Sequence, residues 1–153
     1  MMELRSAWLS TRLLVIRDGQ TIDLDRLAAG GLAAAVFPLV PPICIVTAWN
    51  PMGQEQPIES NEAANLKLLE DLDAKGLPWV HAVGEWDDRT SCEPSFAVGG
   101  LSEDEARDLG TRWAQLAVFY VTDDEVAVLD CAGAFRYVRP RGLRGHHAQE
   151  TTR

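Results

Sequence analysis

The sequence predicts an α+β fold, an α/β sandwich in which two helices cover one face of an antiparallel sheet. Between Ile43 and Val121, segments with strand or helix character follow one another as strand, helix, strand, strand, helix, strand. This order is typical of a ferredoxin-like βαββαβ core. The 153 residues are 46% hydrophobic and 24% charged, and three cysteines are too few for a disulfide scaffold. We therefore expect one folded domain whose sheet is extended by an N-terminal β-hairpin and a C-terminal strand.

The N-terminal part of the chain predicts this hairpin. The apolar run Arg12–Arg17 is followed by the tight-turn dipeptide Asp18-Gly19 and then by a second short run, Thr21–Leu24. The next stretch, Leu27–Val40, is rich in Ala and Leu, but two glycines interrupt it and three prolines end it. It predicts a short, imperfect helix.

The core begins with a strand at Ile43–Ala48, which is apolar on both faces, as a covered strand requires. A helix is expected at about Ser60–Lys75, because three leucines recur on one stripe of its surface. Asn61 and Asn65 continue that stripe, and Ser60 or Asn61 is the expected N-cap. The following strands are expected at Trp79–Val83 and Ser95–Val98.

A second helix is expected to begin after Ser102, because Ser102 and Glu105 have the spacing of a capping box. It should end near Ala114. Two strands then complete the predicted sheet, at Ala117–Val121 and Val126–Cys131. We expect residues 1–135 to form the domain and residues 136–153 to form a basic tail.

The charge distribution limits the classes of partner. From residue 136 onward there are five arginines and one acidic residue, so this segment carries +4 and the rest of the chain −13 of the net charge of −9. An acidic body repels nucleic acid, so only the tail is expected to contact phosphate. Residues 1–10 lack the pattern of a signal peptide, and no apolar run is long enough to span a membrane. We expect a cytoplasmic protein without membrane contact.

Polar residues far apart in the sequence are expected to meet at one end of the sheet. Crossover helices fix the direction of each strand, so the end of the Ile43 strand, the start of the first helix and the loop 85–94 fall on the same side. Gln115, at the junction between the second helix and the following strand, is expected on the same side. The rim formed in this way contains Trp49, Asn50, Asn61, Asn65, Trp86, Glu93, Ser95 and Gln115.

Four short motifs resemble those of an uncharacterised bacterial family, the domain of unknown function 3293. They are Thr47-Ala48-Trp49-Asn50-Pro51, the pair Asn61 and Asn65, Glu93-Pro94-Ser95-Phe96, and Trp113-Ala114-Gln115-Leu116-Ala117. The resemblance covers about residues 43–131. Two departures are visible: Ser91-Cys92 stands where the family pattern has a Trp, for which Trp86 could substitute, and Trp113-Ala114 replaces the usual Phe-Gly. The resemblance implies no activity, but it implies that these polar positions belong together.

The rim chemistry suits a neutral, planar, hydrogen-bonding ligand. Amides both donate and accept hydrogen bonds, and indoles offer stacking surface. Our leading hypothesis is a binding module without catalysis, whose partner is a small molecule or a protein and whose ligand-binding residues are Trp49, Asn50, Asn61, Asn65 and Gln115. The competing structural interpretation is that the amides only satisfy backbone groups of loops.

Two further hypotheses stay open at this stage. The first is a small hydrolase or transferase acting on a neutral substrate, with Glu93 as acid-base and Ser95 as the nearby hydroxyl. His81 lies in mid-strand and is interpreted as a packed histidine. The second is an acidic decoy or assembly component, which rests on the charge of the body.

No pattern indicates a metal or another cofactor. The candidate ligands in one short span, His81, Glu85, Asp87, Asp88, Cys92 and Glu93, include no Cys-x-x-Cys and no paired His. Gly99-Gly100 precedes a helix start, but the acidic residues 103–105 in its first turn would repel a phosphate. Cys44 and Cys131 are interpreted as small core residues.

Overall fold

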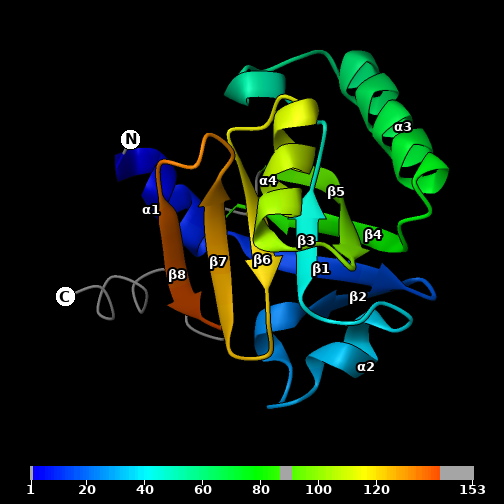
Figure 1. Cartoon of the computed structure of the whole chain (residues 1–153), viewed down its shortest axis with the longest axis vertical. Coiled ribbons are helices and arrows are strands. Elements are labelled where there is room, and N and C mark those ends of the chain that lie inside the picture. Colours follow the sequence, from blue (N-terminus) through cyan, green and yellow to red (C-terminus); the bar gives the residue numbers. More distant parts are fainter. Residues whose placement is uncertain (1, 87–90, 142–153) are drawn as a thin grey trace.

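The computed structural model describes residues 2–86 and 91–141, which form one eight-stranded antiparallel sheet with helices packed around it (Figure 1). The strand order is β2-β1-β4-β5-β3-β6-β7-β8. The strands are β1 (Arg12–Arg17), β2 (Gln20–Asp23), β3 (Ile43–Val46), β4 (Trp79–Glu85), β5 (Cys92–Gly99), β6 (Ala117–Val121), β7 (Glu125–Asp130) and β8 (Arg136–Pro140). The α-helices are α1 (Met2–Ser10), α2 (Leu32–Val36), α3 (Ile58–Ala74) and α4 (Glu103–Arg112), and the 3₁₀ helices are η1 (Leu24–Arg26) and η2 (Pro51–Gly53).

The predicted ferredoxin-like βαββαβ sandwich is wrong, because the sheet is a curled half-barrel in which strands outnumber helices. In Figure 1, β6, β7 and β8 stand upright, while β1 runs across the view toward the right. Each pair of neighbouring strands adds a right-handed twist, and over eight strands the twist turns a layer into a trough. The strands outside the expected core are therefore half of the sheet and not an appendage to it.

Both faces of the curled sheet are buried. One core contains Leu68 and Leu72 of α3 and Leu109 of α4 against β3, β5, β6 and β7. The other core gathers side chains of β1, β3 and β7 around Leu32 and Val36 of α2. Because strands from both ends of the strand order share this second core, it fills the concave side. Alternate apolar residues of one strand, such as β3, therefore serve two cores.

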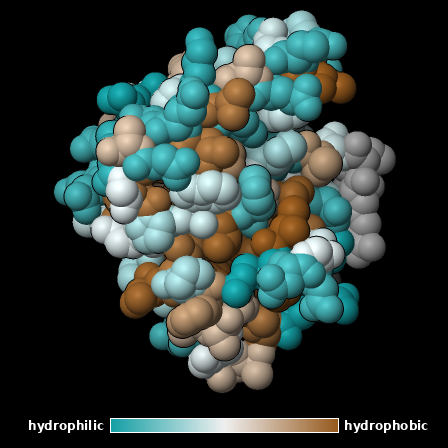
Figure 2. Space-filling model, turned by 90° about the vertical axis from the view of Figure 1, so that its right-hand side faces the viewer, coloured by the Kyte–Doolittle hydropathy of each residue, from teal (hydrophilic) through white to brown (hydrophobic). Residues whose placement is uncertain are grey.

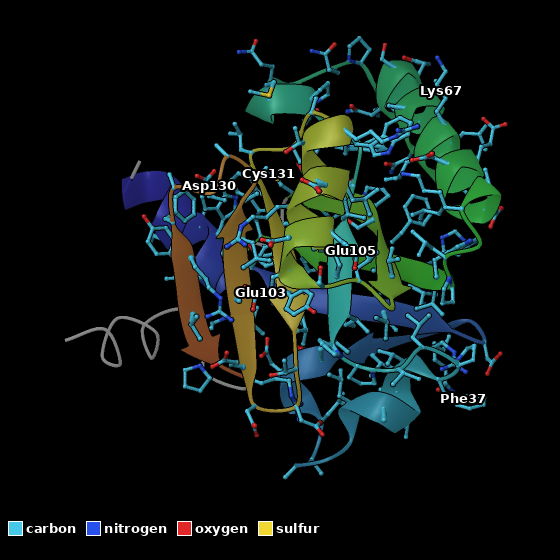
Figure 3. All side chains as sticks on the ribbon, viewed as in Figure 1. Phe37, Lys67, Glu103, Glu105, Asp130 and Cys131 are labelled. Atoms are coloured by element: carbon cyan, nitrogen blue, oxygen red, sulfur yellow. The ribbon has the colours of Figure 1, made fainter. Side chains whose placement is uncertain are left out.

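The local predictions agree with the structure for the hairpin and the two long helices. β1 and β2 pair as predicted across Asp18 and Gly19. Helix α4 begins at the predicted capping box, with Ser102 Oγ accepting from Glu105 N and Glu105 Oε1 accepting from Ser102 N. Helix α3 begins two residues before the predicted start, so its N-cap is Pro57 and not Ser60 or Asn61. Lys67 on α3 points away from the sheet (Figure 3).

Three N- and C-terminal features differ from the predictions. Helix α1 was not expected, and the expected helix at Leu27–Val40 is reduced to five residues, Leu32–Val36, because Gly31 precedes it and Phe37 leaves the helical conformation. The first five residues of the predicted tail form β8, which pairs with β7 from Leu129↔Arg136 to Glu125↔Pro140. The rest of that segment, 142–153, lies outside the described residues.

A buried ion pair joins β8 to the segment that follows β2. The Arg139 side chain is fully buried, and its Nη1 donates to Asp25 Oδ1 at 2.7 Å. Arg139 Nη2 also contacts the Thr11 carbonyl at 3.4 Å, and Arg141 Nη1 donates to the Leu24 carbonyl at 2.7 Å. We call this line of contacts the seam, since it connects the two unpaired edges of the half-barrel.

The connection between α2 and β3 presents apolar side chains at the surface. Phe37 is 66% and Val40 is 74% exposed. Figure 2 shows hydrophobic residues gathered in the middle of the side that faces the viewer.

Within the described residues, no helix combines the length and the apolar character needed to cross a membrane.

Candidate functional site

A pocket of about 820 Å³ opens on the concave side of the sheet, at the end where β3 gives way to the loop 47–57. Its floor comes from β3, β5 and β6, and its walls come from α1, the loop 47–57 and the end of β4. Its lining includes Trp8, Thr11, Trp49, Asn50, Glu55, Gln56, Asn61, Trp86, Glu93, Ser95, Gln115 and Phe119. Six of the seven predicted site residues are among them.

The seventh, Asn65, lies beneath the pocket and fixes its loops. Asn65 is 8% exposed. Its Oδ1 accepts from Ala48 N at 2.8 Å and from Thr47 Oγ1 at 3.2 Å, and its Nδ2 donates to the Pro94 carbonyl at 2.9 Å. Both acceptor positions of the amide oxygen and one of the two N–H donors of Asn65 are thus used inside the protein. This geometry, together with its burial and its absence from the pocket lining, supports a structural role for Asn65.

Asn61 forms a closed pair with Asn50. Asn61 Oδ1 accepts from Asn50 N at 2.8 Å, while Asn61 Nδ2 donates to Asn50 Oδ1 at 2.8 Å. Asn50 Oδ1 also accepts from Gln56 N at 3.1 Å. Asn61 is therefore satisfied, although it borders the pocket, and its side chain sets the path of the loop.

The pocket loop contains residues in the left-handed backbone region. Asn50, Met52 and Ala114 have φ of 47°, 56° and 58°. Met52 N donates to the Ala114 carbonyl at 2.6 Å, which fastens the loop to the end of α4. Gln115 adds a second link, because its Nε2 donates to the Trp49 carbonyl at 3.3 Å and to the Trp113 carbonyl at 3.2 Å. Non-glycine residues in this region cost free energy, and such strain concentrates at functional sites.

Glu93 is the carboxylate of the pocket floor. It lies on β5, opposite Gly84 of β4, and it is partly buried. Burial raises the pKa of Glu93, and a hydrogen bond with the Asn50 side chain lowers it by less, so that the net shift is upward. Among the described residues, Glu93 forms no ion pair. A carboxylate with this environment is a good acceptor for a ligand donor.

Ser95 and His81 do not form a catalytic pair. Ser95 is 6% exposed, and its Oγ donates to the Glu93 carbonyl at 2.9 Å. His81 faces Phe96 across β4 and β5, with ring centroids 5.8 Å apart, and Phe96 belongs to the core on the other face of the sheet. His81 is exposed and not buried as a packed histidine would be, though it does contact Trp79 and Phe96. Nothing in this geometry activates the hydroxyl of Ser95.

Three indoles stand around the pocket. Trp49 and Trp86 were expected there, while Trp8 belongs to helix α1, which was not expected. Thr11 and Phe119 are also lining residues that sequence reasoning missed. The sequence signal for Phe119 was its place in a strand next to β3, but the signal for Trp8 was weak because its helix has no clear apolar stripe.

The candidate metal ligands between His81 and Glu93 form no cluster in the described part of the chain. Within 2–86 and 91–141, no three His, Cys, Asp or Glu side chains gather as a metal site would require. Asp87 and Asp88, two members of the candidate set, lie outside the described residues. Cys44 is fully buried in the core, as predicted, whereas Cys131 lies one residue beyond β7 and is partly exposed.

A comparison with protein families finds one match. The family model described as "Protein of unknown function (DUF3293)" matches residues 46–118. This segment runs from the last residue of β3 to the second residue of β6, so it contains all seven predicted site residues. No curated protein and no solved structure matches the chain.

Proposed function

We propose that this chain, whose residues 46–118 match the model of the DUF3293 family of proteins of unknown function, is a non-catalytic module that binds a small organic molecule in the pocket on the concave side of its sheet. The single observation that carries the proposal is the convergence of three indoles, a partly buried carboxylate and an unused amide oxygen on one hollow of about 820 Å³. Pockets of this size and mixed composition are typical of small-molecule sites. The location expected from the sequence, the cytoplasm, is kept as part of the proposal.

Hydrogen bonds within the protein reduce the number of polar groups that can recognise a ligand. The amides of Asn61 and Asn65 are used within the protein, so the binding groups are fewer than the sequence indicated. Those left for a ligand are the Glu93 carboxylate, Oε1 of Gln115 and the rings of Trp8, Trp49 and Trp86. In the described residues, Oε1 of Gln115 accepts no hydrogen bond from the protein.

Binding is favoured over catalysis because, among the residues that the structure describes, no activated nucleophile accompanies Glu93. The Ser95 hydroxyl donates to a backbone carbonyl, and the ring of His81 is on the opposite face of the sheet. A carboxylate with a raised pKa is also what an acid catalyst needs, but the reaction would require a second group within hydrogen-bond reach.

A thermal-shift screen against a metabolite library tests the proposal. A ligand at about 100 times its Kd stabilises the folded state by about 2.7 kcal/mol, which for a chain of this size is a shift of about 5 to 10 °C in Tm. The hit should lose its shift in Trp86→Ala and keep it in Glu70→Gln, since Trp86 lines the pocket and Glu70 is exposed on α3. A hit that shifts the Trp86→Ala and wild-type proteins equally would place binding elsewhere and contradict the proposal.

A further inference from the structure

The charge of the pocket lining is one-sided. Glu93 and Glu55 are among its residues, while no lysine, arginine or histidine is found in the described part of the lining. In the described part of the lining, a bound anion would meet carboxylates and no compensating cation, which is unfavourable in a partly dry site. The charge of the described lining therefore disfavours anionic ligands, whatever their shape.

The floor of the pocket presents acceptors rather than donors. Glu93 has one neutral side-chain partner, Asn50, and no cationic partner among the described residues. Gln115 directs its two N–H donors to the carbonyls of Trp49 and Trp113, so its Oε1 is the end left for a ligand. A ligand that donates hydrogen bonds and carries positive charge would satisfy both groups at once.

The walls add a second attraction for positive charge. Trp8, Trp49 and Trp86 line the same hollow, and indole is the aromatic ring that attracts a cation most strongly. Trp8 already stacks on Phe135, with ring centroids 5.7 Å apart, so this wall is held in place before a ligand arrives. A wall fixed in this way loses little conformational freedom on binding.

We propose that the pocket selects a small organic cation, an amine or a quaternary ammonium ion, which would lie among the three indoles with its charge toward Glu93. This inference rests on the proposed function and specifies the class of ligand. It also replaces the neutral planar ligand expected from the sequence, because that expectation depended on amides that the protein itself uses.

The test compares probes that differ mainly in charge, with the full chain and isothermal titration calorimetry. Benzylammonium is matched with benzyl alcohol and benzoate, and choline is matched with its uncharged analogue 3,3-dimethylbutan-1-ol. We expect at least one cation to bind at least tenfold more tightly than its neutral analogue, and benzoate not to bind. The primary and quaternary arms distinguish a site that needs N–H donors from one that needs only positive charge.

Variants then assign the effect to the pocket carboxylate. Glu93→Gln should weaken binding of the cation at least tenfold and change binding of the neutral analogue much less, because an amide oxygen still accepts a hydrogen bond from an alcohol but lacks the negative charge. Glu70→Gln removes the same charge from an exposed position of α3 and should change neither. Glu55→Gln should have a smaller effect than Glu93→Gln, since Glu55 is exposed.

The outcomes separate the two proposals. If a neutral analogue binds as tightly as its cation, the pocket is a ligand site but the inference about charge is wrong. If benzoate binds and the cations do not, the inference is also overturned. If no probe binds and the library screen gives no hit, the proposed function itself fails. The comparison of probes on the wild-type protein needs no variant, so a misfolded Glu93→Gln would not prevent a decision.

Discussion

At the scale of single residues, backbone strain gathers around the pocket. Of the four non-glycine residues with positive φ in the described chain, Asn50, Met52 and Ala114 belong to the loop 47–57 or to the end of α4. Asparagine adopts this region more readily than other residues, but methionine and alanine gain nothing from their side chains there. The hydrogen bond from Met52 N to the Ala114 carbonyl joins the two strained positions.

Replacing Ala114 with glycine should therefore stabilise the protein. Glycine adopts a φ of 58° without the steric cost of a Cβ, although it also loses more freedom on folding. We expect the free energy of unfolding of Ala114→Gly to rise by about 0.5 to 1 kcal/mol, measured by urea denaturation. Ala63→Gly, at an exposed position inside α3, should be destabilised by a similar amount. A loss of stability in Ala114→Gly would contradict the assignment of strain.

The sequence predicts which residue types meet at the site, but not which of their polar atoms are free. Strand direction was enough to predict that Asn50, Glu93 and Gln115 share one neighbourhood. It could not show which atoms of the amides are already occupied, because that depends on loop carbonyls such as that of Pro94, which lies 29 positions beyond Asn65. A pattern of residue types gives the composition of a site, whereas free donors and acceptors follow only from the folded backbone.

At the scale of elements, an ion pair couples β8 to α4. Arg136 donates from Nε to Glu103 Oε1 at 2.9 Å and from Nη2 to Glu103 Oε2 at 2.8 Å, a two-bond arrangement that favours a fixed geometry. Figure 3 shows Glu103 at the lower end of α4. The hydrogen bond from Arg136 lowers the pKa of Glu103, and it outweighs the opposing effect of partial burial.

The pH dependence of this pair has a definite sign. A lowered pKa in the folded state means that the pair stabilises the protein above the ordinary glutamate pKa of about 4.3, and that this contribution is lost as the pH falls through the folded-state value. We expect Glu103→Gln to cost about 0.5 to 1 kcal/mol at pH 7, a small value because both side chains are about one third exposed. The difference from wild type should shrink between pH 5 and 3, measured by urea denaturation at a series of pH values.

The matched control for this pair is Asp104→Asn. Asp104 lies in the same first turn of α4, but its side chain is 95% exposed and contacts Arg107 rather than Arg136. It therefore removes a charge from the helix start without touching β8. Equal losses in the two variants would assign the effect to the helix dipole and contradict a specific role for Arg136.

Elements were predicted well where their signals are local, and poorly where they depend on distant partners. The capping box of α4 and the leucine stripe of α3 lie within one helix each, so the sequence around them is sufficient. Strand β8 has two arginines and a proline in five residues, and this composition predicts a tail and not a strand. It becomes a strand because β7 pairs with it and because Asp25, 114 positions away, receives the buried Arg139.

At the scale of the whole molecule, the fold depends on eight strands rather than on the four of the expected core. The order of helices and strands between Ile43 and Val121 was predicted, but the curl of the sheet was not. Curvature is the sum of many small twists together with the packing of α2 on the concave side. Neither quantity is encoded in the periodicity of one segment, so the class of fold was missed although most of its elements were found.

Two truncations test this dependence on the outer strands. A chain that ends at Phe135 loses β8 and leaves Asp25 without Arg139, and breaking a buried pair costs about 3 to 5 kcal/mol. Because a domain has only about 5 to 15 kcal/mol in total, this chain should lose at least 10 °C in Tm or its cooperative transition. A chain that ends at Arg141 keeps every described contact of β8 and should melt like the full chain. Similar melting of both truncations would show that β8 is dispensable.

The seam also links the fastening of the barrel to the hollow inside it. Arg139 reaches from β8 to Asp25 and to the carbonyl of Thr11, and Thr11 in turn lines the pocket beside Trp8 of α1. If the contacts of Arg139 break transiently, the pocket wall at Thr11 and Trp8 loses its support. A ligand bound in the pocket should therefore stabilise the closed position of β8. Backbone amides of β8 would then exchange with solvent more slowly in the liganded protein. Hydrogen exchange at this edge strand would therefore report whether the pocket is occupied.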